Sequence, residues 1–529
     1  MIAAHGREVL EVAVGLGTLI AMIYGAWRVM RSWFRSKTEP LRKAFAGLQQ
    51  VPALQSDLDI VRKAVLPNGG TSLPDGVRRI ESALLSVRND VSMMACTMAA
   101  HNDNDPNKGV FECDASGANI SVNRTYARWI GVGKDELLGL YESIRGKCMA
   151  AAEHADKTPK LLTKEEVMRP LAPHSPEQVR AEATRAADAE TRLKVFGSEK
   201  QLPENQPPRH LAIQINQALH DLFAKYPESL LFGEDVAAKG GVYTVTKGLH
   251  KAFKSNRVFN TLLDETSILG LAQGFANMGM LPFPEIQYLA YFHNACDQIR
   301  GEACSLQFFS NDQYRNPMVM RVAGLGYQRG FGGHFHNDNS VTALRDIPGL
   351  IVGCPSRGDD AAMMLRTLAA MARVDGRVCA FLEPIALYMT KDLYEPGDAL
   401  WSTPYPAPDQ ALEFGAERVY HGDATDLLIV TFGNGVPFAL RTAKAVETQT
   451  GKKTRVIDLR WLQPLNAKAI ARHAGDCDRI LVLDEGRRSA GIGEGVITAI
   501  VEGGHGAKPL VRVVGDDTYT PLAGAANLI

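Results

Sequence analysis

Residues 230–236 read Leu-Leu-Phe-Gly-Glu-Asp-Val, a short apolar run that ends in a glycine and two acids. A run of this length bounded by turn residues predicts a β-strand buried on both faces. Similar runs follow at helix-length intervals, at residues 257–260, 317–322, 350–353 and 379–382. Strands that alternate with helices favour a mainly parallel sheet with helices on both faces.

A second set of apolar runs lies beyond the proline-rich stretch Ser402-Thr-Pro404-Tyr-Pro406-Ala-Pro408. These runs cover residues 427–432, 454–459, 480–483 and 510–514. The carboxy-terminal two thirds of the chain therefore predicts an α/β fold made of two doubly wound sheets in tandem.

The amino-terminal end has a different composition. Residues 9–27 are apolar apart from Glu11, and 19 helical residues span about 28 Å, close to the hydrocarbon thickness of a bilayer. Arg28, Arg31, Arg35 and Lys37 follow at once, which predicts that the long carboxy-terminal part lies in the cytoplasm, with an anchor in the cell membrane. A buried amphipathic helix and a signal peptide are the alternatives.

Three further segments separate this predicted transmembrane helix from the sheets. Apolar spacings of three and four over residues 38–107 predict a helical spacer. Residues 108–140 read as strand, turn, strand and short helix, and resemble the opening of a PAS sensor domain. Residues 141–208 favour charged helices: Thr163 and Glu166 predict a capping box, and Ser175 and Pro176 predict the start of a solvated helical arm.

The predicted domains therefore fall in the following order. They are a membrane anchor (1–37), a helical spacer (38–107), a PAS-like fragment (108–140), a tail and linker (141–208), a first α/β domain (209–402) and a second α/β domain (403–529).

Charge and cysteine content exclude several classes of protein. The 58 Lys and Arg residues balance 59 Asp and Glu residues, so no overall basic field attracts nucleic acid, and we expect no nucleic-acid partner. The eight cysteines include no Cys-x-x-Cys pair, which favours free thiols in a reducing compartment over a disulfide scaffold or a structural zinc site.

The order of motifs across residues 209–525 resembles the beta subunit of a thiamine-diphosphate-dependent 2-oxo acid dehydrogenase, a transketolase-like enzyme. The motifs are Gly233-Glu-Asp-Val236, Gly240-Gly-Val-Tyr243, Glu265, Gly270-x-Ala-x-Gly274, Pro284-Glu-Ile-Gln287, Tyr291, Asp297-Gln-Ile299 and Gly332-Gly-His-Phe-His336. The resemblance implies a pyrimidine-binding domain over 209–402 and a transketolase C-terminal domain over 403–529. Residues 141–208 resemble the tail of an alpha subunit.

Glu265 is the main catalytic candidate. From its position before the apolar helix Ile268-Leu-Gly-Leu-Ala, it could equally be a first-turn acid favoured by the helix dipole. The resemblance implies that Glu265 hydrogen-bonds the aminopyrimidine ring of the cofactor. It also implies that Leu263, Gln287 and Tyr291 line the pocket of that ring, although Ala290 replaces the acid that usually precedes the tyrosine.

Two histidines offer a second candidate. If the chain is extended there, His334 and His336 project on one face, but no third ligand at a useful spacing supports a metal pair. The resemblance instead implies that His336 lies at the mouth of the active site. There it would hold a proton and steady the incoming lipoyl group.

The cofactor's metal has no evident ligands in this chain. The superfamily holds Mg2+ on a Gly-Asp-Gly motif supplied by the alpha part, and no Gly-Asp-Gly occurs in these 529 residues. The resemblance therefore implies an alpha subunit or domain in trans, a lipoyl acyltransferase core as a further partner, and a homo- or hetero-oligomer.

The function predicted from the sequence is oxidative decarboxylation of a 2-oxo acid, branched-chain or pyruvate, with transfer of the acyl group to lipoyl. One alternative is another transketolase-like enzyme, such as a sugar-phosphate ketol transferase. The other is a membrane-tethered signalling or scaffold protein in which the α/β part is an inactive passenger.

Overall fold

The computed structural model describes residues 111–113, 120–122, 134–158, 161–326, 333–521 and 523–528. The chain forms two compact units, residues 1–160 and 161–529. The predicted membrane anchor and helical spacer lie outside the described residues. Among the helices that the structure describes, none is long and apolar enough to span a bilayer.

In the first unit, two short strands pair antiparallel. They are β1 (Phe111–Cys113) and β2 (Ile120–Val122), with Phe111 opposite Val122. The predicted hairpin is therefore present. The helix after it, α5 (Lys134–Lys157), is not short: it runs straight through the predicted boundary at residue 140. No proline interrupts these residues, so nothing stops the helix before Pro159.

The tail that precedes the first sheet is packed over residues 176–196, whereas residues 164–168 include no buried residue. Its helices are α6 (Lys164–Met168), α7 (Pro176–Thr184) and α8 (Ala189–Phe196). The predicted capping box of Thr163 and Glu166 is confirmed at α6. Ser175 makes no capping hydrogen bond, and the predicted single arm is broken where Asp188 caps α8. Val179 and Ala183 of α7 are buried in the core. Their small side chains allow the helix to pack closely against it.

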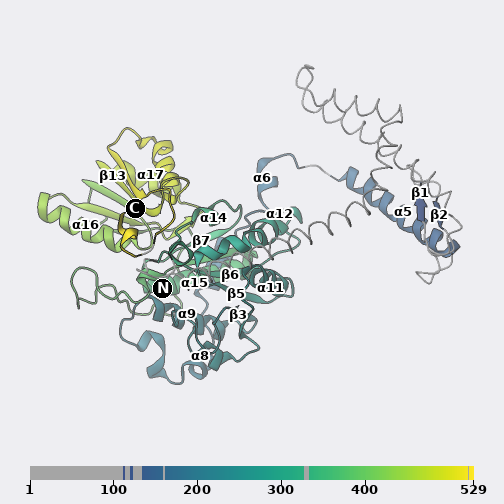
Figure 1. Ribbon diagram of the computed structural model, residues 1–529, viewed down its shortest axis with the longest axis horizontal. Helices are drawn as coiled ribbons and strands as arrows, with labels where there is room; N and C mark the ends of the chain where they lie inside the picture. The colour runs from purple at the N-terminus through teal and green to yellow at the C-terminus, as the bar shows by residue number, and fades with distance from the viewer. Residues whose placement is uncertain are drawn as a thin grey trace, which may run out of the picture. The chain divides into compact units, whose positions relative to one another are not determined.

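The second unit holds a seven-stranded sheet in the order β12-β7-β8-β6-β5-β3-β4, in which only the edge strand β12 is antiparallel (Figure 1). Its strands are β3 (Ser229–Gly233), β4 (Val258–Asn260), β5 (Leu281–Ile286), β6 (Met318–Gly324), β7 (Ile351–Gly353), β8 (Val378–Pro384) and β12 (Trp461–Gln463). Helices α9 (Leu211–Lys225) and α15 (Gly358–Asp375) pack on one face, and α11 (Glu265–Asn277) packs on the other. The predicted parallel sheet is confirmed.

Shorter helices complete this layer. They are α10 (Leu249–Phe253), α12 (Cys304–Phe309), α13 (His334–Asn337) and α14 (Thr342–Arg345), with helical turns at Leu289–Ala295 and Gln298–Ala303.

Strand β5 is the element that the pattern of apolar runs does not predict. Its sequence, Leu-Pro-Phe-Pro-Glu-Ile, carries two prolines, which are unfavourable inside a sheet. The structure accommodates both because pairing with β6 begins only beyond them, at Glu285 opposite Arg321.

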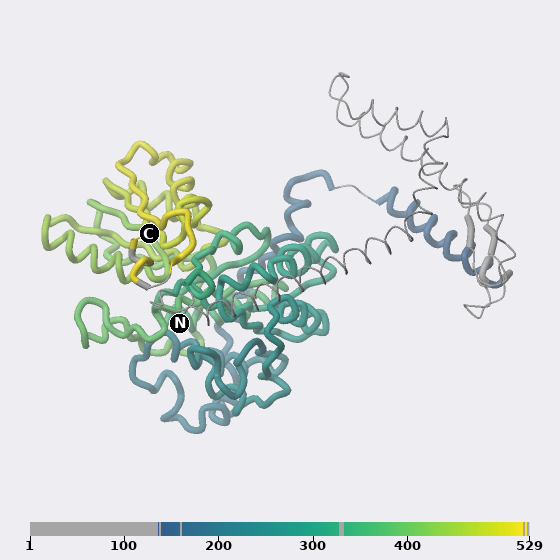
Figure 2. The backbone as a smooth tube through the Cα atoms, viewed as in Figure 1, coloured from purple at the N-terminus to yellow at the C-terminus, as the bar shows by residue number. Residues whose placement is uncertain are grey.

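The second domain has a five-stranded sheet in the order β14-β13-β10-β11-β9, with only β9 antiparallel. Its strands are β9 (Arg418–Tyr420), β10 (Leu427–Thr431), β11 (Thr454–Asp458), β13 (Arg479–Arg487) and β14 (Leu510–Gly515), and its helices are α16 (Gly435–Thr450), α17 (Ala467–Asp476) and α18 (Ile492–Ile500). Figure 2 follows the chain from the teal residues of the first domain to the yellow residues of the second. Strand β12 belongs to the second domain by its place in the sequence, but it pairs with β7 of the first sheet. Strand pairing therefore joins the two domains, in addition to the linker.

Candidate active site

The candidate residues gather where the parallel strands of the first sheet end. From β3 the chain moves to β4 on one side and then to β5 on the other, so the strand order reverses between β3 and β5. Ligands of open α/β sheets bind outside the carboxyl ends of the strands at such a point. Glu234 directly follows β3, and Gln287 directly follows β5. A Cβ at Gly233 would lie 2.7 Å from the carbonyl oxygen of Glu285, so only glycine fits between these strands.

Glu265 is the first residue of α11 and is only 5% exposed. The side chain of Asp264 caps the helix by accepting a hydrogen bond from the Ser267 N–H at 3.1 Å. Asn294 Nδ2 donates to Oε2 of Glu265 at 3.2 Å. The acid is thus buried at a helix N-terminus, where the helix dipole favours its charge.

Glu234 also belongs to the site. It lies in the motif Gly233-Glu-Asp-Val236, but the resemblance assigns it no role. Burial raises its pKa to about 7, and the negative charges of Glu265, Asp235 and Glu285 contribute to the increase. Glu234, after β3, and Glu265, at the start of α11, are therefore close enough for the charge of one to affect the other. The signal was available in the sequence, since Glu234 is the first polar residue after an apolar strand.

The structure brings the rings of Tyr291 and His336 close together. The His336 ring lies 4.5 Å from the Tyr288 ring and 5.9 Å from the Tyr291 ring, edge to face in both cases. Burial raises the pKa of Tyr291, and the charges of Glu265 and Glu234 raise it further. Within this aromatic cluster of Tyr288, Tyr291 and His336, Tyr291 is therefore the ring that lies near both acids.

His334 does not share the surroundings of His336. The chain turns at Gly333 and forms the short helix α13, so residues two apart do not project on one face as they would in an extended strand. The His334 ring instead lies 5.0 Å from the Tyr519 ring. The expectation that the two histidines project on one face is therefore wrong. Within the described residues, no group of three or more His, Cys, Asp or Glu side chains could hold a metal ion.

The remaining two predicted residues lie differently. Leu263 is 79% exposed in the loop between β4 and α11. Gln287 lines a small pocket together with Tyr243, Glu285, Arg321 and Tyr388.

A buried ion network lies behind that pocket. Arg321 on β6 pairs with Glu285 on β5 and with Glu383 on β8, at 2.7 Å from Nε to Oε1 for the second. The Tyr388 hydroxyl donates to Oε2 of Glu383 at 2.6 Å. Burial raises the pKa of Glu285, although Arg321 acts in the opposite direction. This network fixes the ends of three adjacent strands around Gln287.

Glu234 is expected to make stability depend on pH. Folding raises its pKa, so the folded state binds the proton more tightly and loses stability as the pH rises from about 5 to about 7. Glu234→Gln imitates the protonated acid. Thermal unfolding should therefore show equal stability of variant and wild type at about pH 5, and a more stable variant at about pH 8. Equal pH dependence of the two proteins would contradict this assignment; the exposed Glu302→Gln serves as control.

Residues 210–391 match the family described as transketolase, pyrimidine binding domain, and residues 417–528 match transketolase, C-terminal domain. The 3-methyl-2-oxobutanoate dehydrogenase subunit beta of Mycobacterium tuberculosis is 34% identical over 317 residues, which cover 59% of this chain and 86% of that protein. The pyruvate dehydrogenase E1 component subunit beta of Staphylococcus epidermidis is 31% identical over 59% of this chain and 92% of that protein. Its Staphylococcus aureus counterpart is 32% identical over the same shares.

Among solved structures, a split gene transketolase described as an inactive beta4 tetramer is 20% identical. It covers 58% of this chain and 89% of that chain, with a TM-score of 0.46.

Proposed function

Because the chain belongs to the family of 2-oxo acid dehydrogenase beta subunits, we propose that it supplies the pyrimidine-binding half of a thiamine-diphosphate site. The complete enzyme would decarboxylate a branched-chain 2-oxo acid or pyruvate oxidatively and transfer the acyl group to a lipoyl arm. The observation that carries this proposal is the buried carboxyl of Glu265 beside Glu234 and the aromatic cluster.

The residues at this edge of the sheet fit the aminopyrimidine end of the cofactor. Glu265 offers a buried carboxyl to a ring nitrogen, and Asn294 holds that carboxyl from the other side. When bound, thiamine diphosphate supplies the electron sink that makes loss of CO2 from a 2-oxo acid feasible. Glu234, with a pKa of about 7 that the charge of Glu265 helps to raise, can exchange a proton near neutral pH.

His336 is our candidate for the proton carrier of this site. Its ring is held by Tyr288 and Tyr291, which restricts its orientation. A histidine held in this way can give or take a proton as the acyl group moves to the lipoyl arm.

The described residues do not fit the metal end of the cofactor, since they contain no cluster of ligands for Mg2+. We therefore assign the diphosphate and Mg2+ to an alpha subunit in trans, and the lipoyl arm to an acyltransferase core.

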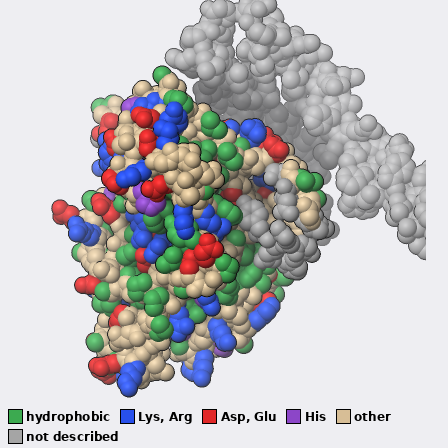
Figure 3. All heavy atoms as spheres, turned by 90° about the vertical axis from the view of Figure 1, so that its left-hand side faces the viewer, with side chains coloured by type: hydrophobic (Ala, Val, Ile, Leu, Met, Phe, Trp, Pro, Cys, Tyr) green, Lys and Arg blue, Asp and Glu red, His purple; other side chains and the backbone are tan. Residues whose placement is uncertain are grey.

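On the face in Figure 3, Lys and Arg are interspersed with Asp and Glu, without one continuous basic patch for a polyanion.

The exposed side of α11 is the surface that an alpha subunit would cover. Leu262 and Leu263 precede the helix, Leu271 lies on it and Met278 follows it, and all four are exposed. A Cβ at Gly270 or Gly274 would have no neighbour within 4 Å, so another helix can approach this side closely. The surface adjoins Glu265, so a partner that covers it would also close the site.

The test is calorimetry of thiamine diphosphate with Mg2+, for this chain alone and for its mixture with a family alpha subunit. We expect binding only in the mixture, and loss of binding with Leu271→Asp, which puts a charge on the docking surface. Val501→Asp, at an exposed apolar residue of the second domain, should bind as wild type.

Binding by neither sample would contradict the proposal. Activity of the mixture with a sugar phosphate but not with a 2-oxo acid and lipoamide would identify another transketolase-like enzyme instead.

A further inference from the structure

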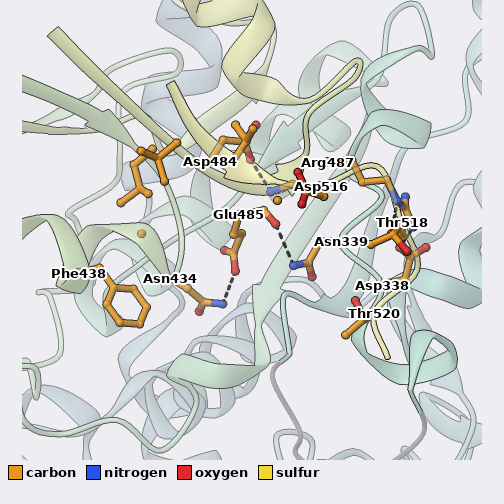
Figure 4. A pocket seen from close by; sticks show the side chains of 16 residues that line it. Asp338, Asn339, Asn434, Phe438, Asp484, Glu485, Arg487, Asp516, Thr518 and Thr520 are labelled. Atoms are coloured by element: carbon orange, nitrogen blue, oxygen red, sulfur yellow. Dashed lines mark hydrogen bonds and ion pairs between the residues drawn. The ribbon is translucent and has the colours of Figure 1, made fainter. Parts of the chain in front are cut away.

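A cavity of about 290 Å3 opens at the carboxyl edge of the second sheet (Figure 4), and its lining includes none of Glu234, Glu265 and Gln287. From β10 the chain continues to β11 on one side and to β13 on the other, so the strand order reverses between β10 and β13. The cavity lies there, between Asn434 at the start of α16 and Glu485 near the end of β13. Position and volume are those of a small-molecule site.

The donors that line this cavity are already used by the protein. Asn434 Nδ2 donates to the Leu325 carbonyl at 2.7 Å and to Oε2 of Glu485 at 2.8 Å. Arg487 donates to Oδ1 of Asp338 at 2.6 Å and, through Nε, to the Thr518 carbonyl at 3.1 Å. Figure 4 shows Asn434 turned toward Glu485, and Asp338 and Thr518 grouped on the opposite wall.

The N-terminus of α16 is not available to an anion either. The N–H groups of Gly435 and Val436 bond to the carbonyls of Phe432 and Gly433, and Pro437 has no N–H. An anionic ligand would therefore find few free donors in this cavity.

One hydrogen-bond acceptor of the lining, in contrast, is not used by the protein. Asn434 is 2% exposed, and its Oδ1 atom has no hydrogen-bond partner among the described residues. A buried acceptor without a donor is costly, so a ligand that brings one would be favoured. The lining carries the acids Asp338, Asp484, Glu485 and Asp516 against one cation, Arg487, so its net charge is negative, although Asp338 pairs with Arg487 and Asp516 with Arg488.

The rim of the cavity is apolar. Phe438 on α16 and Val513 on β14 both line it, yet they are 55% and 51% exposed. Apolar side chains at the rim of an acidic cavity suit a ligand with a short hydrocarbon body and a cationic end.

We propose that this cavity binds a primary ammonium group carried on a short alkyl chain. The ammonium group donates to Asn434 Oδ1 and faces the acidic lining, and the alkyl part packs between Phe438 and Val513.

Calorimetry of the full chain with 1,4-diaminobutane tests this site, with butyrate as the anion of similar length. We expect binding of the diamine, weaker at high ionic strength because exposed charges are screened, and no binding of butyrate. Binding of butyrate alone, or of neither compound, overturns the proposal.

Two variants locate the binding. Val513→Lys puts a protein ammonium group at the rim and should weaken diamine binding more than tenfold, whereas an anion site would bind more tightly. Asp516→Asn, at an exposed carboxylate that does not threaten folding, should weaken it about two- to fivefold. Glu447→Gln, an exposed acid of α16 outside the lining, should bind as wild type. Wild-type affinity of both cavity variants would place the diamine elsewhere and overturn the proposal.

Discussion

Glu265→Gln is expected to lower 2-oxo acid decarboxylation by the complex with an alpha subunit about 10²- to 10⁴-fold, the usual contribution of a positioned acid or base. Glutamine keeps the size of the side chain and can still contact Asn294, but it cannot carry or release a proton. The loss should therefore appear in kcat, measured as CO2 release at saturating substrate, with little change in thermal unfolding.

Glu302→Gln is the matched control, because Glu302 is an exposed acid in the turn Gln298–Ala303 of the same domain. It should retain wild-type activity. If Glu265→Gln also retained it, Glu265 would be only the first-turn helix acid that its sequence position allows, and Glu234 would become the main acid of the site.

Much of the first sheet was predictable because its strands are buried on both faces. Continuous apolar runs such as residues 230–233 and 379–382 have no other stable environment in a soluble domain, and both are strands. Strand β5 was not predictable because proline is unfavourable inside a sheet and this strand contains two prolines. Only the pairing register of β5 with β6 shows why they are tolerated.

Individual residues of the candidate site could be predicted from the sequence only where they lie in a recognisable motif. Glu265, Tyr291 and His336 were found through the resemblance, and the structure brings them to one edge of the sheet. The role of Glu234 depends on its distance from Glu265 in space, because mutual repulsion and burial raise its pKa together. The position of Glu234 after an apolar strand marks it as a candidate, but the sequence does not show that Glu265, 31 residues later, lies near it.

Arg321→Met is expected to lower the free energy of unfolding by about 3–5 kcal/mol, the usual cost of leaving buried charges without their partner. Glu285 and Glu383 would then share one side of the sheet with no cation between them. Urea unfolding followed by circular dichroism measures the change.

The pH dependence of the Arg321 variant distinguishes lost charge pairing from lost packing. Burial already raises the pKa of Glu285 in the presence of Arg321, and removal of the guanidinium should raise it further. The folded variant would then hold protons that the unfolded chain releases, so its deficit relative to wild type should shrink as the pH falls toward about 5. A deficit that stays constant with pH would contradict the charge argument. Arg373→Met breaks the exposed pair with Glu228 and should cost less than about 1 kcal/mol, so equal losses for both variants would show that burial of the network adds nothing.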